Sequence, residues 1–180
     1  IHLSGFANSI SDSSARAHHR LLELAPDDVM ISFDPNFRSQ VISREDYLER
    51  SWALLERCDC FLPSRGEAAL FARPGETEDD VCMRLAQTKK VALKDSSNGC
   101  YVFHQGQKLH IPAYHVEEVD STGAGDTFDG ALIAATMDGK DLPQAAEYAT
   151  AASAVAVTRR GLMDIAPTRQ DVEDMIRRGR

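Results

Sequence analysis

The sequence predicts an α/β protein with a mostly parallel sheet that carries helices on its faces. Short apolar runs alternate nearly throughout with amphipathic patterns of about 10 to 15 residues, which is typical of βαβ units. The length of 180 residues suits one domain with a sizeable core. With 43% hydrophobic and 27% charged residues, the composition is that of an ordinary globular protein.

The expected strands and helices follow from the periodicity of the hydrophobic residues and from the positions of turn and capping residues. Strands are expected at residues 1–5, 28–34, 60–63 and 91–95, and a hairpin at 100–113 that turns near Gln105 and Gly106. Helices are expected at about 12–25, 44–57, 77–88, 124–137, 143–158 and 169–178. The predicted caps of the first three helices are Asp12 or Ser13, Ser43, and Thr77 with Asp80.

Polar segments follow four of the predicted strands or their hairpin, at residues 34–38, 63–67, 94–99 and 120–126. Ligands of parallel sheets collect at the carboxyl ends of the strands. We therefore expect these four segments to form one site.

Charge and composition exclude several classes of partner. A formal net charge of −8 argues against binding to nucleic acid or anionic lipid, since both need clustered Lys and Arg. No apolar run has the length of a membrane span, and no secretory leader opens the chain. The spacing of Cys58, Cys60, Cys82 and Cys100 fits neither a disulfide framework nor a paired metal site, which predicts reduced thiols in a cytoplasmic protein.

The segment GAGD, residues 123–126, carries the most specific chemistry. Small residues at a helix start leave backbone N–H groups open to an anion, in line with the positive end of the helix dipole. A carboxylate beside such an anion hole suits a general base that takes the proton of a hydroxyl attacking phosphate. The alternative is that Asp126 is only a dipole-stabilised acid of a first helical turn.

Asp129 lies three residues beyond Asp126, roughly on the same side of the helix. It either raises the pKa of the proposed base or is a surface acid on a helix. We interpret it as a surface acid.

Residues 120–130, DSTGAGDTFDG, resemble the signature of the ribokinase-like carbohydrate kinases, the phosphofructokinase-B type, which runs approximately D-T/P-x-G-A-G-D-x-F-x-G. Other segments are similar to the family's loops in the same order. SFDPNFR resembles D-x-N-x-R, FLPSRGEAALF resembles N-x-x-E, VALKDSSNGCYVF resembles the nucleotide loop V-x-K-x-G-x-x-G, and AASAVAVTRRGLMDIAP resembles the closing helix with its TRxG turn. The resemblance thus covers nearly the whole chain.

The resemblance implies a three-layer αβα fold and phosphoryl transfer from ATP, with Mg²⁺ and a monovalent cation, to a sugar hydroxyl. Asp126 would be the general base, and the amides of Gly123, Ala124 and Gly125 would form the anion hole. ATP would be bound by Asn36, Arg38, Ser64, Lys94, Ser96, Gly99, Gly123 and Gly125. Arg38 and Asp126 would contact the substrate, and Glu67 would organise the Mg²⁺ shell through water.

Two positions depart from the family pattern. Ser64 stands where the family has Asn, and it could equally be a simple helix cap, with Glu67 as the acid half of a capping box. Ser96 stands where the nucleotide loop has its first Gly. The second change calls into question a close approach of this backbone to the nucleotide.

The pattern is most similar to the 2-keto-3-deoxygluconate kinase branch, with fructokinases close behind. A planar guanidinium at Arg38 suits the carboxylate of a sugar acid, although it equally suits an ATP phosphate. Residues 1–180 are expected to be the carboxy-terminal, nucleotide-binding and catalytic part of such a kinase. That part lacks the family's first strands and β lid, so we expect it to associate as a homo-oligomer or with its missing amino-terminal segment.

Two other classes compete with the kinase. One is a non-catalytic binding or assembly module on the same fold, which the departures at Ser64 and Ser96 would favour. The other is a dinucleotide-binding oxidoreductase, which the late position of the glycines opposes.

Overall fold

The computed structural model describes residues 1–161 and 166–180. The chain divides into two compact units. Unit 1 comprises Ile1–Leu93 and Gln105–Gln107, and unit 2 comprises Lys94–His104 and Lys108–Arg180. Residues 162–165, which follow the predicted TRxG turn in the segment AASAVAVTRRGLMDIAP, lie outside the described residues.

The sheet has six strands in the order β1-β2-β3-β4-β5-β6. Its first four are β1 (His2–Ser4), β2 (Ser32–Asp34), β3 (Cys60–Phe61) and β4 (Lys90–Lys94), and each pairs in parallel with the next. The register aligns Leu3 with Phe33 and Phe33 with Phe61. These side chains are at most 1% exposed, so the register places the apolar residues of neighbouring strands side by side in the core. The predicted mostly parallel α/β sheet is confirmed.

Helices alternate with these strands in unit 1. They are α1 (Gly5–Ser9), α2 (Asp12–Leu24), α3 (Arg44–Arg57), the 3₁₀ turn η1 (Ala68–Phe71) and α4 (Glu78–Leu85). The predicted caps Ser43 and Thr77 are confirmed. The cap of α2 is Ser11 rather than Asp12 or Ser13, because the Ser11 hydroxyl accepts the Ser14 N–H.

The short helix α1 was not predicted, because five residues are too few to show a helical period. Its first residue, Gly5, lies against the loop that follows β2. A Cβ there would lie 2.1 Å from the carbonyl oxygen of Pro35. Only glycine allows this close approach.

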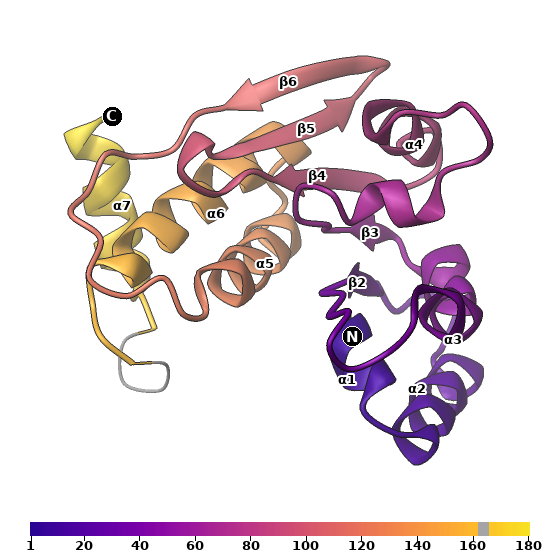
Figure 1. Ribbon diagram of the computed structural model, residues 1–180. Helices are drawn as coiled ribbons and strands as arrows, with labels where there is room; N and C mark the ends of the chain where they lie inside the picture. Colours follow the sequence, from indigo (N-terminus) through magenta and orange to yellow (C-terminus); the bar gives the residue numbers. More distant parts are fainter. Residues whose placement is uncertain (162–165) are drawn as a thin grey trace. The chain divides into compact units, whose positions relative to one another are not determined.

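Unit 2 begins with the last residue of β4 and the 3₁₀ turn η2 (Ser96–Asn98), followed by the predicted hairpin of β5 (Cys100–His104) and β6 (Gln107–Ile111). Its turn residues Gln105 and Gly106 have φ values of 51° and 73°, as a two-residue hairpin turn requires. Three helices complete the unit: α5 (Ala124–Met137), α6 (Leu142–Val157) and α7 (Arg169–Arg178) (Figure 1).

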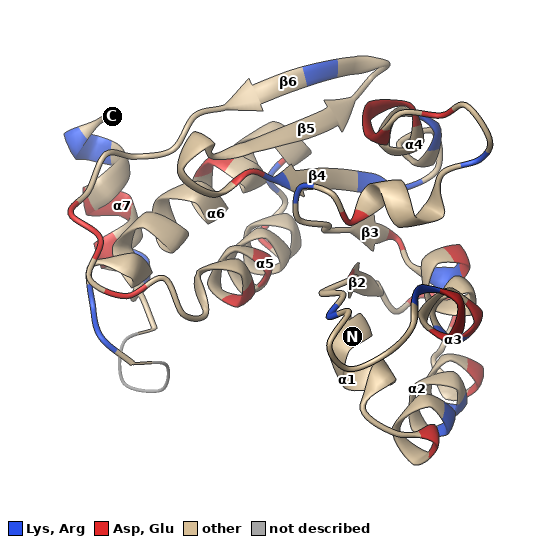
Figure 2. Ribbon diagram, in the orientation of Figure 1, with Lys and Arg blue, Asp and Glu red and all other residues tan. Residues whose placement is uncertain are grey.

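Helices α5 and α6 carry acidic residues but no Lys or Arg. Figure 2 shows both signs of charge along α2, α3 and α7, whereas α5 carries only the carboxylates Asp126 and Asp129. Helix α6 packs against α5, α7 and β5, and all of its alanines are buried. Because alanine side chains are small, the backbones of neighbouring elements can pack close to α6, which contacts the other helices of unit 2 and β5.

Two further properties concern the cysteines and the length of the helices. All four cysteines are buried, and no disulfide joins them within the described chain. Burial raises the pKa of the Cys58 and Cys100 thiols to about 12. No helix in the described ranges is long and apolar enough to span a membrane.

Candidate active site

Backbone donors are open at the start of helix α5. Gly123 caps the helix in the left-handed region at φ 76°, which glycine adopts without strain. Within the described chain, the N–H groups of Gly123, Gly125 and Asp126 have no acceptor. Ala124 departs from the expected set of donors, because its N–H donates to the carbonyl of Ser121 at 3.1 Å. The open donors are therefore three neighbouring amides that include the Asp126 amide and not that of Ala124.

The loop before α5 is anchored by Asp120. Its carboxylate accepts the N–H groups of Thr122 at 3.0 Å and Gly161 at 3.3 Å. Hydrogen bonds from Thr122 hold the pKa of the Asp120 carboxyl below its usual value, with a further contribution from Gly161. The N–H groups of Val119 and Asp120 both donate to the carbonyl of Val157, at the end of α6. This loop therefore has a fixed position relative to α6.

The two carboxylates of α5 have opposite environments. Asp126, in the first turn, is exposed, so the predicted base is accessible. The prediction that Asp129 is a surface acid is wrong: Asp129 is 1% exposed and its two oxygens each accept a hydrogen bond of 3.0 Å from Lys94. Local sequence pattern could not pair Asp129 with Lys94, since the two residues are 35 positions apart.

The predicted nucleotide loop, residues 94–99, is closed by its own hydrogen bonds. The Asp95 N–H donates to the Gly99 carbonyl at 2.8 Å. Ser96 has φ 49°, so it adopts the left-handed conformation for which the family uses glycine. Gly99 is required by packing, because a Cβ there would lie 2.1 Å from the carbonyl oxygen of Ile111.

The remaining predicted residues belong to unit 1, where Glu67 joins two loops. One Glu67 oxygen accepts the Phe37 N–H at 2.9 Å, and the other accepts the Ser64 N–H at 2.7 Å. Asn36, at φ 39°, donates its N–H to Asp34 at 3.2 Å, and Arg38 is exposed. The contact with Ser64 has the spacing of the acid half of a capping box, but Ser64 does not cap a helix, because the N-cap of η1 is Glu67 itself.

The structure thus places the predicted residues in two groups. Asn36, Arg38, Ser64 and Glu67 lie in unit 1, and Lys94, Ser96, Gly99 and residues 123–126 lie in unit 2. Sequence reasoning missed Asp129 as a site residue, although a second acid one turn beyond the motif was the available signal. Within the described ranges, no cluster of His, Cys, Asp and Glu could hold a metal ion by itself.

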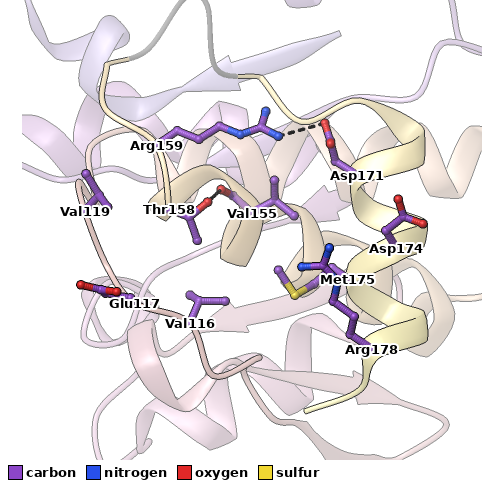
Figure 3. A pocket seen from close by; sticks show the side chains of 10 residues that line it. All are labelled: Val116, Glu117, Val119, Val155, Thr158, Arg159, Asp171, Asp174, Met175 and Arg178. Carbon is purple, nitrogen blue, oxygen red and sulfur yellow. Dashed lines mark hydrogen bonds and ion pairs between the residues drawn. The ribbon is translucent and has the colours of Figure 1, made fainter.

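A cavity of about 450 Å³ opens elsewhere in unit 2. It lies between residues 116–119, the end of α6 and helix α7 (Figure 3). The Arg159–Asp171 ion pair of 3.1 Å crosses one side, and Met175 contributes an apolar wall. None of the predicted site residues is among the described side chains that line it, so the cavity is separate from the start of α5.

Comparison with known proteins decides the family. Residues 1–169 match the family described as "pfkB family carbohydrate kinase". The chain belongs to the pfkB family of carbohydrate kinases. This membership confirms the resemblance of residues 120–130 and the ribokinase-like fold.

Relatives within the pfkB family include fructokinases. Fructokinase-1 of Oryza sativa subsp. japonica is 31% identical over 93% of this chain and 55% of its own length. The fructokinase of Escherichia coli is 28% identical over 96% of this chain and 59% of its own length. The chain therefore spans little more than half the length of these relatives.

One of the similar solved structures contains a bound nucleotide. The E. coli protein named "putative Ribokinase II", in complex with ATP and Mg²⁺, is 32% identical and superposes with a TM-score of 0.88. The match covers 98% of this chain and 58% of that protein. The three-layer α/β fold is confirmed by this likeness.

Proposed function

We propose that the full-length protein is an ATP-dependent sugar kinase, and that this chain supplies its nucleotide-binding and phosphoryl-transfer part. The observation that carries the proposal is the start of α5. There the open amides of Gly123, Gly125 and Asp126 adjoin an exposed carboxylate, in a chain of the pfkB family. Open amides at a helix N-terminus bind phosphate groups, so this helix start fits the triphosphate of ATP.

In this proposal Asp126 accepts the proton of the sugar hydroxyl as that oxygen attacks the γ-phosphorus. ATP would supply the phosphoryl group: the bond between the γ-phosphorus and the β–γ bridging oxygen breaks, and ADP leaves with that electron pair. Mg²⁺ would neutralise charge on the phosphates. The amides of Gly125 and Asp126 donate to the oxygens on which negative charge increases during transfer. The Asp120 anchor keeps these donors in place, because it fixes the preceding loop to the end of α6.

The residues of unit 1 have supporting roles in the proposal. Glu67 accepts amide hydrogen bonds from Phe37 and Ser64 and, in this proposal, would also organise the Mg²⁺ shell through water. Asn36 and Arg38 would face the sugar and the phosphates, and Ser64, Lys94, Ser96 and Gly99 would border the nucleotide. The left-handed φ of Ser96 supports this role, since the loop keeps a backbone conformation suited to glycine. We also retain the proposal of a monovalent cation beside ATP and Mg²⁺.

The sugar is the finer part of the proposal. From the sequence we first expected 2-keto-3-deoxygluconate as the substrate. The relatives named fructokinase favour fructose instead. Arg38 still provides a guanidinium for the carboxylate of a sugar acid. The chain spans little more than half the length of its fructokinase relatives, and we propose that it associates as a homo-oligomer or with the remainder of such a protein. The buried thiols fit the proposed cytoplasmic location.

The test is phosphorylation by the full-length protein with Mg-ATP and two acceptors, fructose and 2-keto-3-deoxygluconate. We expect turnover with fructose, and Arg38→Met should lower it no more than it weakens the binding of Mg-ATP, since Arg38 also faces the phosphates in this proposal. Turnover with the sugar acid that Arg38→Met lowers at least tenfold would instead support the sugar-acid kinase. Binding of Mg-ATP without turnover on any sugar would contradict a kinase and favour the non-catalytic module.

A further inference from the structure

A buried ion pair joins the two segments assigned to the nucleotide. Lys94 ends β4 and directly precedes the loop 95–99, while Asp129 lies one turn beyond Asp126 on α5. The ammonium of Lys94 donates to both oxygens of Asp129 at 3.0 Å. Lys94 is 8% exposed and Asp129 is 1% exposed. Because both partners are buried, the position of each side chain is set by the other.

The ammonium also lies beside the open amides. A Cβ built on Gly125 would lie 3.8 Å from the Lys94 Nζ, in ordinary contact. The positive end of the helix dipole repels a cation at this position. Asp129 supplies a compensating negative charge for the ammonium, which lies buried behind Gly125.

Backbone hydrogen bonds next to Lys94 and Asp129 connect the ion pair to the loop 95–99 and to the first turn of α5. Residue 95 follows Lys94 directly, and its N–H closes the nucleotide loop on Gly99. On the other side, the Thr127 N–H donates to the Gly123 carbonyl at 2.8 Å, which ties the first turn of α5 to its cap. A shift of either charged group therefore moves the loop 95–99, the open amides, or both.

We propose that Asp129 is a positioning residue for nucleotide binding, which through Lys94 holds the loop 95–99 and the first turn of α5 in one fixed register. The proposal deepens the proposed function and rests on it for the identity of the nucleotide. Asp129 touches neither nucleotide nor sugar in this scheme, and all of its effect passes through Lys94.

The test is a double-mutant cycle in the full-length protein with Asp129→Asn, Lys94→Met and the combined variant. The dissociation constant of Mg-ATP is measured by calorimetry, and thermal unfolding is followed in parallel. We expect Asp129→Asn to weaken Mg-ATP binding about tenfold and to have no further effect once Lys94 is Met. An equal loss in both backgrounds, or an unchanged dissociation constant in a folded Asp129→Asn protein, would overturn the proposal.

Two measurements keep the result interpretable. Hydrogen exchange should increase in both 95–99 and 121–127 in the Asp129→Asn protein, whereas a purely structural role would raise exchange throughout α5. If Asp129→Asn does not fold, Asp129→Glu keeps the charge and lengthens the arm, and it should show the same local exchange with a smaller loss of affinity. Unchanged exchange and affinity in Asp129→Glu would contradict the positioning role.

An ion pair of unit 1 provides the matched control. Glu76 accepts hydrogen bonds from Arg84 at 2.7 and 2.9 Å, and these hold the pKa of its carboxyl at about 2. Glu76→Gln should lower thermal stability without changing the Mg-ATP dissociation constant. Neither binding nor exchange requires sugar turnover. Failure of the kinase assignment is therefore recognised separately, by absent turnover in the unaltered protein.

Discussion

Loops in the two units use carboxylates in opposite ways. In unit 1, one oxygen of Glu67 accepts a hydrogen bond from the amide of Phe37, and the other accepts one from the amide of Ser64. In unit 2, the amides of Gly125 and Asp126 stay open and the carboxylate of Asp126 is exposed. The first arrangement fixes two loops to each other, and the second keeps donors and a base available. A carboxylate near a loop therefore gains its role from the amides around it.

The largest effect is expected from Asp126→Asn, which removes the proposed base and keeps the shape of the side chain. Turnover by the full-length protein should fall by about 10²- to 10⁴-fold, since general base catalysis contributes factors of this size. The dissociation constant of Mg-ATP should change little. Steady-state kinetics and calorimetry measure the two quantities.

Asp138→Asn is the control for this variant, because Asp138 lies at the other end of α5 and is paired with Arg169. It should leave turnover unchanged. Full turnover by Asp126→Asn would show that the exposed carboxylate of unit 2 is not the base.

A smaller effect, on stability, is expected from Glu67→Gln. The amide side chain keeps one acceptor oxygen and turns a donor toward the second backbone N–H, so one of the two loops loses its partner. We expect a loss of about 1 to 3 kcal/mol in the free energy of unfolding, measured by denaturant titration.

Glu49→Gln serves as the reference, since Glu49 is an exposed acid of α3 in the same unit. Its effect should stay within about 0.5 kcal/mol. Equal stability of the two variants would show that Glu67 does not join the loops, and the contrast between the units would fail.

The smallest effect is expected from Gly125→Ala. This variant should be more stable than the unaltered protein and should bind ATP more weakly. The added methyl group fits, because its nearest neighbour would be the Lys94 Nζ at 3.8 Å. Replacing a helical glycine should stabilise the fold by up to about 1 kcal/mol. The methyl group also narrows the approach to the open amides, so the KM for ATP should rise by about threefold to tenfold.

Gly130→Ala is the matched control on the same helix, where a Cβ would meet nothing within 4 Å. It should give a similar gain in thermal stability with an unchanged KM for ATP. If both variants leave the KM unchanged, the open amides of unit 2 do not receive the nucleotide.

Most of the fold could be predicted because its signals are local. Helices α5 and α7 have the predicted bounds, and the hairpin turns at Gln105 and Gly106 as expected. Strands β1, β2 and β3 are shorter than their predicted runs, since an apolar run reports burial whereas a strand also needs a hydrogen-bonded neighbour. The unpredicted helix α1 has only five residues, and the choice of Ser11 as cap over Asp12 depends on one hydrogen bond.

By itself, the sequence determined the order of elements, the parallel sheet and the GAGD segment of the pfkB family, because these depend on residue period and on neighbours within a few positions. Tertiary structure alone decided that Asp129 is buried against Lys94 and that Glu67 joins two loops. Both contacts link residues at least 30 positions apart. No local pattern encodes such a partner, since burial and charge compensation arise only when the folded chain brings the two segments together.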